Sequence, residues 1–225
     1  MVLAELKNIK KSYLQAGLET PVLKNINLTV EATDFIAVTG PSGSGKSTLL
    51  NILGCLLTPC SGSYLFDGRD ITALDEKSKA IFRNSSIGLI FQDHKLLPQF
   101  TALENILLPV FAVKNTIDKT YRERADYLLK QTGMENLAAR YPGQLSGGES
   151  QRTAICRSLI MNPSLVLADE PTGALDQATA SGVAELLNSL RKTENIAVIM
   201  VTHAQRMADM AAKRYALENG TLQQY

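Results

Sequence analysis

The 225-residue sequence contains no tryptophan and only three cysteines. Cys55, Cys60 and Cys156 are odd in number, and no two of them form a C-x2-C pair. The sequence therefore predicts neither a disulfide framework nor a zinc site. We expect all three cysteines to be small residues of the core.

An excess of one charge and long apolar runs are also missing. Twenty-three basic and 22 acidic residues leave a net charge of +1, which offers no broad field for a nucleic acid or an anionic membrane. The apolar run at residues 196–201 is far shorter than the ~20 residues of a membrane-spanning helix. Residues 1–20 lack the apolar centre of a signal peptide. We expect a protein of the cytosol that binds no nucleic acid.

The apolar pattern that is present predicts a single α/β domain over residues 1–225. Residues 3–9 and 26–30 alternate apolar and polar side chains, as half-exposed antiparallel strands do, whereas residues 35–39 form a continuous apolar run typical of a buried parallel strand. Further buried strands are predicted at 87–91, 165–168 and 197–201, separated by helices at 46–53, 177–190 and 204–212. Strands that alternate with helices imply a parallel sheet covered on both faces.

The middle of the chain is almost wholly helical in pattern, most clearly at residues 123–131 and 148–159. We therefore predict a helical lobe, at about residues 93–159, inserted into a core formed by 1–92 and 160–225. A hairpin around Asn219 and Gly220 is predicted at the end of the chain.

A phosphate-binding loop is predicted between the strand at 35–39 and the helix that follows. The segment GPSGSGKS fits G-x-x-x-x-G-K-[ST], in which glycines let backbone N–H groups curl around phosphates at a helix N-terminus. Lys46 supplies a full positive charge and Ser47 a hydroxyl for Mg²⁺. A plain glycine-rich turn is the alternative, but the flanking strand and helix favour a nucleoside triphosphate site. The predicted phosphate-binding residues are Gly40, Pro41, Ser42, Gly43, Ser44, Gly45, Lys46, Ser47 and Thr48.

Two carboxylates end the buried strand at 165–168. Asp169 is placed to orient the ligands of Mg²⁺, and Glu170 to act on the attacking water. Alone, this pattern is more often a strand that meets solvent. Together with the phosphate-binding loop it predicts hydrolysis of the nucleotide.

A second anion-binding segment, LSGGESQR at residues 145–152, opens a helix. Ser146, Gly147 and Gly148 present a hydroxyl and backbone N–H groups at the helix N-terminus. Ser146 and Glu149 also fit a capping box, which is compatible with phosphate contact. Two phosphate-binding segments in one chain predict a head-to-tail dimer, in which residues 145–152 of each chain cover the phosphate-binding loop of the other.

These motifs together resemble the ATP-binding subunits of ABC transporters over essentially the whole chain. The resemblance implies a P-loop NTPase fold: a RecA-like, mostly parallel sheet with an N-terminal antiparallel β lobe and an inserted α-helical lobe. It implies ATP and Mg²⁺ as ligands, and a transmembrane permease and a second copy of the chain as partners. It also implies a peripheral protein on the cytoplasmic face of the inner (cell) membrane.

The resemblance also assigns roles to single residues. Tyr13 matches an aromatic that stacks on adenine, and Gln92, in FQD, matches a glutamine that reaches Mg²⁺ and the attacking water. Asp176, in GALD, matches a loop that crosses the dimer interface, and His203 matches a switch histidine that contacts the γ-phosphate. His94 has no such support, and we expect it to be a surface residue near the contact with the membrane partner.

The branch of the family is indicated by residues 91–106 and 167–176. They resemble the lipoprotein-releasing, macrolide-exporting and bacitracin-resistance ATPases, and also a cell-division ATPase that transmits force without transport. A soluble ATPase of the same fold, in DNA repair or translation, remains an alternative, although the chain has neither a coiled-coil insertion nor two cassettes. A regulator without turnover is disfavoured because Glu170 and His203 are both present.

An apolar patch is predicted shortly after Gln92, at Leu96, Leu97, Pro98 and Phe100. These side chains could pack in the core of the helical lobe, but together we predict that they receive a short helix of the membrane subunit.

Overall fold

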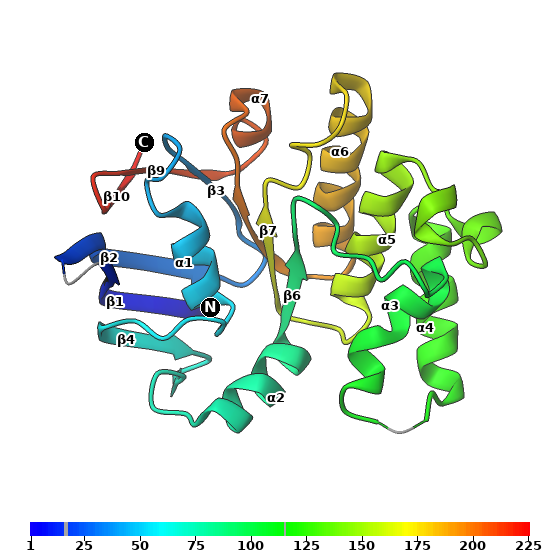
Figure 1. Cartoon of the computed structure of the whole chain (residues 1–225), viewed down its shortest axis with the longest axis horizontal. Coiled ribbons are helices and arrows are strands. Elements are labelled where there is room, and N and C mark those ends of the chain that lie inside the picture. The colour runs from blue at the N-terminus through cyan, green and yellow to red at the C-terminus, as the bar shows by residue number, and fades with distance from the viewer. Residues whose placement is uncertain (16–17, 115) are drawn as a thin grey trace.

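The computed structural model describes residues 1–15, 18–114 and 116–225 and contains two sheets with helices packed around them (Figure 1). The four-stranded sheet has the order β2-β1-β4-β5, and the six-stranded sheet the order β10-β9-β3-β8-β7-β6. The strands are β1 (Val2–Gln15), β2 (Leu18–Glu31), β3 (Phe35–Thr39), β4 (Ser61–Phe66), β5 (Arg69–Asp70), β6 (Ile87–Ile90), β7 (Leu165–Asp169), β8 (Ala197–Val201), β9 (Lys213–Glu218) and β10 (Thr221–Gln224).

The four-stranded sheet is the predicted antiparallel lobe, but β1 and β2 are longer than their alternating segments. Each strand has 14 residues, and the pairing continues to Gln15 opposite Leu18. The outer part of β2 is exposed on both faces, so it carries no apolar alternation. The hydrophobic pattern therefore predicted only the half of each strand that lies on the core.

The six-stranded sheet carries the residues of interest on one edge. Strands β3, β8, β7 and β6 run parallel to one another, so their carboxyl ends meet at the same edge. Gly40 follows β3, Glu170 follows β7, and Gln92 and His203 lie two residues beyond β6 and β8. The fold thus brings four distant segments of the chain to one place.

The continuous apolar runs of these strands follow from burial on both faces. In β3, Phe35 and Ala37 belong to one hydrophobic cluster, and Ile36 and Val38 to the other. The first cluster lies under the helical lobe, and the second lies between the sheet, the helix after β3 and the antiparallel lobe. A strand enclosed in this way has no polar face.

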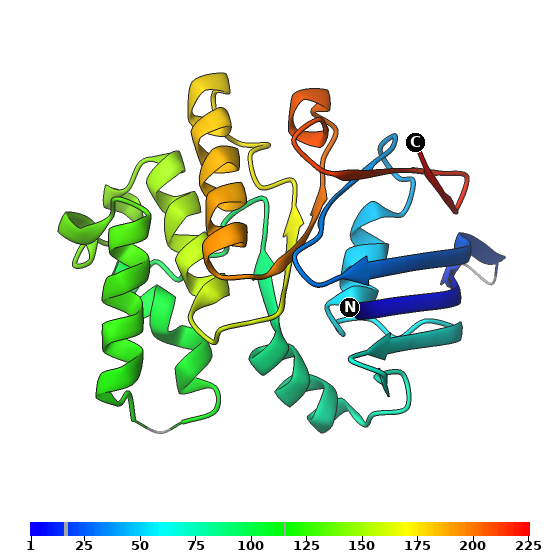
Figure 2. The ribbon, with the colours of Figure 1, turned by 180° about the vertical axis from the view of Figure 1, so that it is seen from behind.

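The helices are α1 (Lys46–Leu53), α2 (Glu76–Ser86), α3 (Ala102–Phe111), α4 (Lys119–Gln131), α5 (Gly147–Leu159), α6 (Gln177–Thr193) and α7 (Gln205–Ala208), with short 3-10 turns at Glu135–Leu137 and Pro142–Gln144. Helices α3, α4 and α5 form the helical lobe, on the side of the sheet away from the antiparallel lobe (Figures 1 and 2). None of the helices described is long and apolar enough to cross a membrane.

Gly88, in β6, sets how closely α5 approaches the sheet. A Cβ atom at this position would lie 2.4 Å from the backbone oxygen of Ser158. Only glycine permits this contact between strand and helix backbones. The second anion-binding segment, residues 145–152 at the start of α5 and called the signature segment from here on, is thereby held close to the strand that precedes Gln92.

Two expectations are wrong. The helix predicted at 204–212 ends at Ala208, because the chain turns there to begin β9; the buried side chain of Ala211 belongs to that turn. Cys60 is exposed, whereas Cys55 and Cys156 are buried as expected. Burial raises the pKa of the Cys55 thiol to about 11 and that of the Cys156 thiol to about 12.

Candidate nucleotide-binding site

The loop between β3 and α1 has the backbone geometry of a phosphate cradle. Gly40, Gly43 and Gly45 have φ angles of 151°, 77° and 102°, which side chains with a Cβ rarely adopt. Gly45 caps α1 without a side-chain hydrogen bond. The first N–H groups of α1 therefore remain available to an anion, at the positive end of the helix dipole.

Lys46 lies at the centre of this loop. Its side chain is buried, and its ammonium donates hydrogen bonds of 2.8 Å to the carbonyl oxygens of Gly40 and Pro41. These neutral partners do not neutralise the charge. A phosphate within the loop would supply the anionic partner that a buried cation favours.

Asp169 faces the loop from the end of β7. Burial raises the pKa of its carboxyl group, and the charge of Glu170 adds to this shift, while a hydrogen bond from Ser47 and the charge of Lys46 oppose it. The hydroxyl of Ser47 thus lies near the carboxylate of Asp169. Both are hard oxygen ligands of the kind that Mg²⁺ prefers.

Glu170, Gln92 and His203 gather next to Asp169. Glu170 has a φ of 45°, and its backbone N–H is held by the Val201 carbonyl at 2.9 Å. Its Oε1 lies 3.1 Å from Nδ1 of His203. Its Oε2 and the Nε2 of Gln92 both lie within 3.3 Å of the position a Cβ would take at Gly173. The predicted catalytic side chains therefore share one corner of the site.

The phosphate-binding loop, Glu170 and His203 line a cleft of about 560 Å³, whereas Gln92 and Asp169 are not among its described lining residues. Among the predicted residues, its walls include Gly40, Ser42, Gly43, Gly45, Lys46, Ser47, Thr48, Glu170 and His203. The Tyr13 hydroxyl lies 3.4 Å from Oγ1 of Thr48, a residue of the cleft wall, but Tyr13 is not itself among the described lining residues. Pro41 and Ser44 do not line it, and the buried Ser44 hydroxyl has no partner among the described residues. Val22 lines it too, but nothing distinguishes this residue from other strand valines in the sequence.

The signature segment, at the start of α5, is not among the described residues that line this cleft. The Ser146 hydroxyl accepts from Glu149 N–H at 3.3 Å, and the Glu149 carboxylate accepts from Ser146 N–H at 2.7 Å, which confirms the capping box. The hydrogen bonds from the Ser146 backbone and side chain lower the pKa of Glu149. Ser146 and Gly147 are exposed, whereas Gly148 is buried. Among the described residues, the walls of the cleft include none of these three.

Asp176 caps α6, a role the sequence reasoning did not assign. Its carboxylate accepts hydrogen bonds from Ala178 N–H at 3.0 Å, Thr179 N–H at 3.1 Å and the Thr179 hydroxyl at 2.5 Å. These bonds, led by that of the Thr179 hydroxyl, lower its pKa. The proposed contact of Asp176 with a second chain stays a prediction.

His94 does not lie free on the surface as expected. It is half-buried, and its Nδ1 forms a hydrogen bond with Oε1 of Gln151, a fully buried residue of α5. The sequence contains no signal for this pair, because the partners lie 57 residues apart.

Comparisons with known proteins agree with this geometry. The sequence model of one family, described as ABC transporter, matches residues 23–173. The chain is 46% identical over 215 residues to the lipoprotein-releasing system ATP-binding protein LolD 1 of Rhodopirellula baltica, which covers 95% of this chain and 93% of the relative. It is 44% identical over 224 residues to the macrolide export ATP-binding/permease protein MacB of Syntrophobacter fumaroxidans, which covers 99% of this chain but 31% of that one.

Among solved structures, the ATP-binding cassette MJ0796, a dimer in a post-hydrolysis state bound to ADP and Pi, matches with a TM-score of 0.90. The match has 38% sequence identity and covers 99% of this chain and 98% of the other. The chain thus spans about a third of the macrolide-export relative and nearly all of the lipoprotein-releasing one. The chain belongs to the ABC transporter family, as an ATP-binding ATPase subunit of the branch that includes the lipoprotein-releasing and macrolide-export proteins.

Proposed function

We propose that two copies of this chain hydrolyse ATP as a head-to-tail dimer bound to a transmembrane permease. The complex would serve lipoprotein release or the efflux of macrolides or peptides, from the cytoplasmic face of the cell membrane. The observation that carries the proposal is the separation of the two phosphate-binding segments. The cleft at α1 lacks the signature segment, while Ser146 and Gly147 lie exposed at the start of α5, in the other lobe (Figures 1 and 2). The cassette MJ0796 is a dimer with ADP and Pi.

Each residue of the cleft has a task in this reaction. Lys46 and the N–H groups at the start of α1 bind the phosphates. Ser47 and Asp169 would hold Mg²⁺, which neutralises charge on the transferred phosphate when it is bound. In the part of the chain described, no group of three or more His, Cys, Asp or Glu side chains is arranged to hold a metal ion by itself, so the nucleotide and water would supply most of the remaining oxygen ligands.

Glu170 is the proposed general base. It lies just beyond Asp169 and next to Gln92, where it would polarise a water for attack on the γ-phosphate while Gln92 orients that water. The contact of 3.1 Å between Glu170 Oε1 and His203 Nδ1 would turn the other imidazole nitrogen towards the phosphate.

Glu170→Gln tests this function. The amide keeps the shape of the side chain and removes the carboxylate, so ATP binding should persist while turnover falls roughly 10²-fold or more. ATP should then accumulate in a stable dimer, detected by size-exclusion chromatography. Glu185→Gln, at an exposed position of α6, is the matched control and should hydrolyse ATP normally. If Glu170→Gln hydrolysed ATP at the parental rate, Glu170 would not be the general base.

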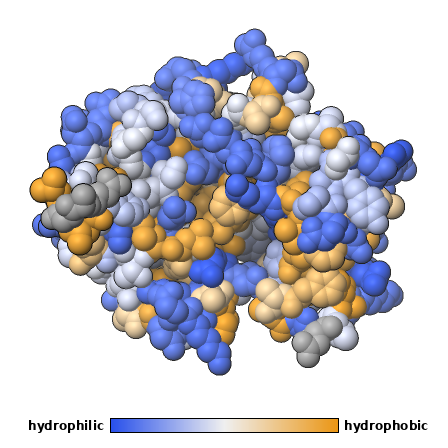
Figure 3. Space-filling model, in the orientation of Figure 1, coloured by the Kyte–Doolittle hydropathy of each residue, from blue (hydrophilic) through white to orange (hydrophobic). Residues whose placement is uncertain are grey.

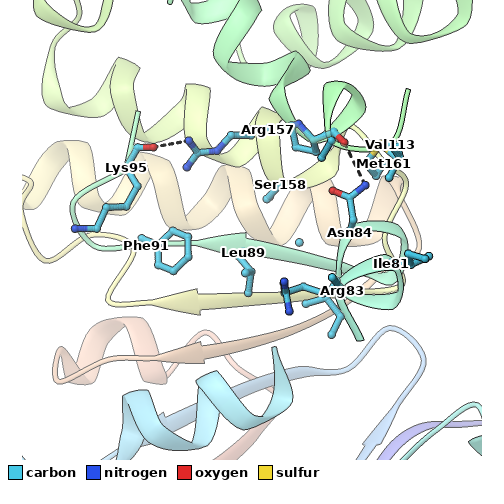
Figure 4. A pocket seen from close by; sticks show the side chains of 15 residues that line it. Ile81, Arg83, Asn84, Leu89, Phe91, Lys95, Val113, Arg157, Ser158 and Met161 are labelled. Carbon is cyan, nitrogen blue, oxygen red and sulfur yellow. Dashed lines mark hydrogen bonds between the residues drawn. The ribbon is translucent and has the colours of Figure 1, made fainter. Parts of the chain in front are cut away.

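A groove between the two lobes is the proposed contact with the permease. It has a volume of about 420 Å³ and is formed by α2, β6, the end of α3 and α5 (Figure 4). Hydrophobic surface flanks a hollow at this place (Figure 3), and Ile81 and Val113, which line the groove, are 56% and 48% exposed. The apolar patch predicted for this contact, at Leu96, Leu97, Pro98 and Phe100, is not among the described lining residues, although the neighbouring Lys95 is.

The charge of the groove indicates what would fill it. Arg83, Lys95 and Arg157 lie in its walls, and the described lining contains no Asp or Glu. A short permease helix with an apolar face and acidic ends would therefore fit. A soluble ATPase of the same fold would leave these apolar side chains exposed without use.

A further inference from the structure

We propose that His94 is a positioning residue, which holds the catalytic-site residue Gln92 in place from helix α5. His94 lies two residues after Gln92, and its Nδ1 bonds Oε1 of Gln151 in the first half of α5. The inference rests on the proposed role of Gln92 in hydrolysis. It assigns a task to a histidine that none of the phosphate-binding motifs contains.

The turn that carries His94 is held in an unfavourable conformation by α5. His94 and Lys95 have φ angles of 58° and 50°, and residues with a Cβ keep such angles only where their surroundings enforce them. The guanidinium of Arg157, on α5, donates to the backbone oxygens of Lys95 at 2.6 Å and His94 at 2.5 Å. Figure 4 shows the bond to Lys95. Backbone and side chain of the turn are therefore both fixed to the same helix.

Gln151 accepts the side-chain hydrogen bond that joins His94 to α5. An amide oxygen only accepts hydrogen bonds, so Nδ1–H of His94 is the donor of the hydrogen bond to Oε1 of Gln151. Gln151 is fully buried, and its Nε2 has no hydrogen-bond partner in the described part of the chain. An apolar side chain would avoid the cost of this half-satisfied amide. The contact with His94 is what the buried glutamine contributes.

The same helix begins with the signature segment. Ser146 caps α5, and Gln151 lies little more than one turn further along. A helix of 13 residues moves as a rigid element, so a displacement of Ser146 towards a partner's nucleotide also displaces Gln151 and the turn bonded to it. At the other end of this connection, Gln92 Nε2 and Glu170 Oε2 both lie against Gly173. His94 thus links closure of the signature segment to the position of Gln92.

The test uses the full chain with His94→Ala, His94→Asn, Gln151→Met and the double variant His94→Ala with Gln151→Met. Steady-state ATPase kinetics and the melting temperature are measured for each. A misplaced Gln92 should lower kcat roughly ten- to a hundredfold, with the KM for ATP and the melting temperature close to those of the parent. His94→Asn, which keeps an N–H donor near the place of Nδ1, should recover most of kcat. The double variant should be no slower than the worse single variant.

Three results would overturn the inference: an unchanged kcat in His94→Ala, equal losses in the Asn and Ala variants, or losses that multiply in the double variant. A fall in melting temperature that accounts for the lost activity would also overturn it, because His94 would then only stabilise the fold. Gln92→Ala separates the two levels of the proposal. If Gln92→Ala keeps the parental kcat, the proposed role of Gln92 is wrong. If Gln92→Ala loses activity but the His94 and Gln151 variants do not, the proposed role of His94 is wrong.

Discussion

Gly148→Ala should destabilise the chain, although alanine is the better helix former. A Cβ at Gly148 would lie 2.5 Å from the Cγ2 methyl of Thr179, on α6. The methyl cannot rotate away freely, because the Thr179 hydroxyl is bonded to Asp176. Because the methyl cannot move away, overpacking here should cost about 2–3 kcal/mol, the upper part of the usual range; up to about 1 kcal/mol returns as helix propensity, so that a net cost of about 1–2 kcal/mol remains. For a chain of this size we expect the melting temperature to fall by roughly 2–8 °C.

Two further variants make this prediction specific. Thr179→Ser removes the clashing methyl and keeps the hydroxyl for Asp176, so the double variant with Gly148→Ala should recover the parental melting temperature. Gly182→Ala, in α6 with no atom within 4 Å of its would-be Cβ, should instead raise it, because alanine stabilises an unstrained helix by about 0.5–1 kcal/mol. Thermal denaturation followed by circular dichroism measures all four proteins. A Gly148→Ala variant as stable as the parent, or one that Thr179→Ser does not restore, would refute the packing argument.

The remaining predictions concern the binding of ATP and of the membrane subunit. Lys46→Ala removes the full positive charge of the loop, worth on the order of 3 kcal/mol on a phosphate; ATP affinity by direct titration should fall roughly 10²-fold, and unchanged affinity would refute the phosphate-binding assignment. Ile81→Glu and Val113→Glu should abolish co-purification with the membrane subunit from detergent and leave basal ATPase activity and melting temperature unchanged. Leu56→Glu, 47% exposed and outside the groove lining, should leave all three unchanged, and groove variants that still co-purify would remove the permease contact from this groove.

The sequence predicted the central sheet well because burial on both faces leaves a simple pattern. Residues such as Ile36 and Val38 must all be apolar, and the motifs that follow each strand need particular side chains for their chemistry. The polar outer part of β2 left no such pattern. The short α7 was overestimated for a related reason, since Ala211 is buried in a turn and periodicity reports burial rather than helix length.

Contacts between side chains distant in the sequence were the least predictable part of the site. The capping box at Ser146 is local and was found. The bond from His94 to Gln151, the approach of α5 to Gly88 and the burial of Lys46 by its own loop depend on how the lobes pack. No spacing rule covers such pairs, so the sequence predicts a surface residue at His94.

The composite site is tested most directly by mixing two inactive variants and measuring ATP hydrolysis. Lys46→Ala lacks a working phosphate-binding loop, and Ser146→Arg blocks the signature segment while leaving its own loop intact. Each variant alone should be inactive, and Ser146→Arg should still bind ATP. In an equimolar mixture half of the dimers are mixed, each with one complete site, so about a quarter of parental activity should return. A mixture as inactive as its components, or a Ser146→Arg chain that binds ATP as weakly as Lys46→Ala, would contradict the head-to-tail dimer.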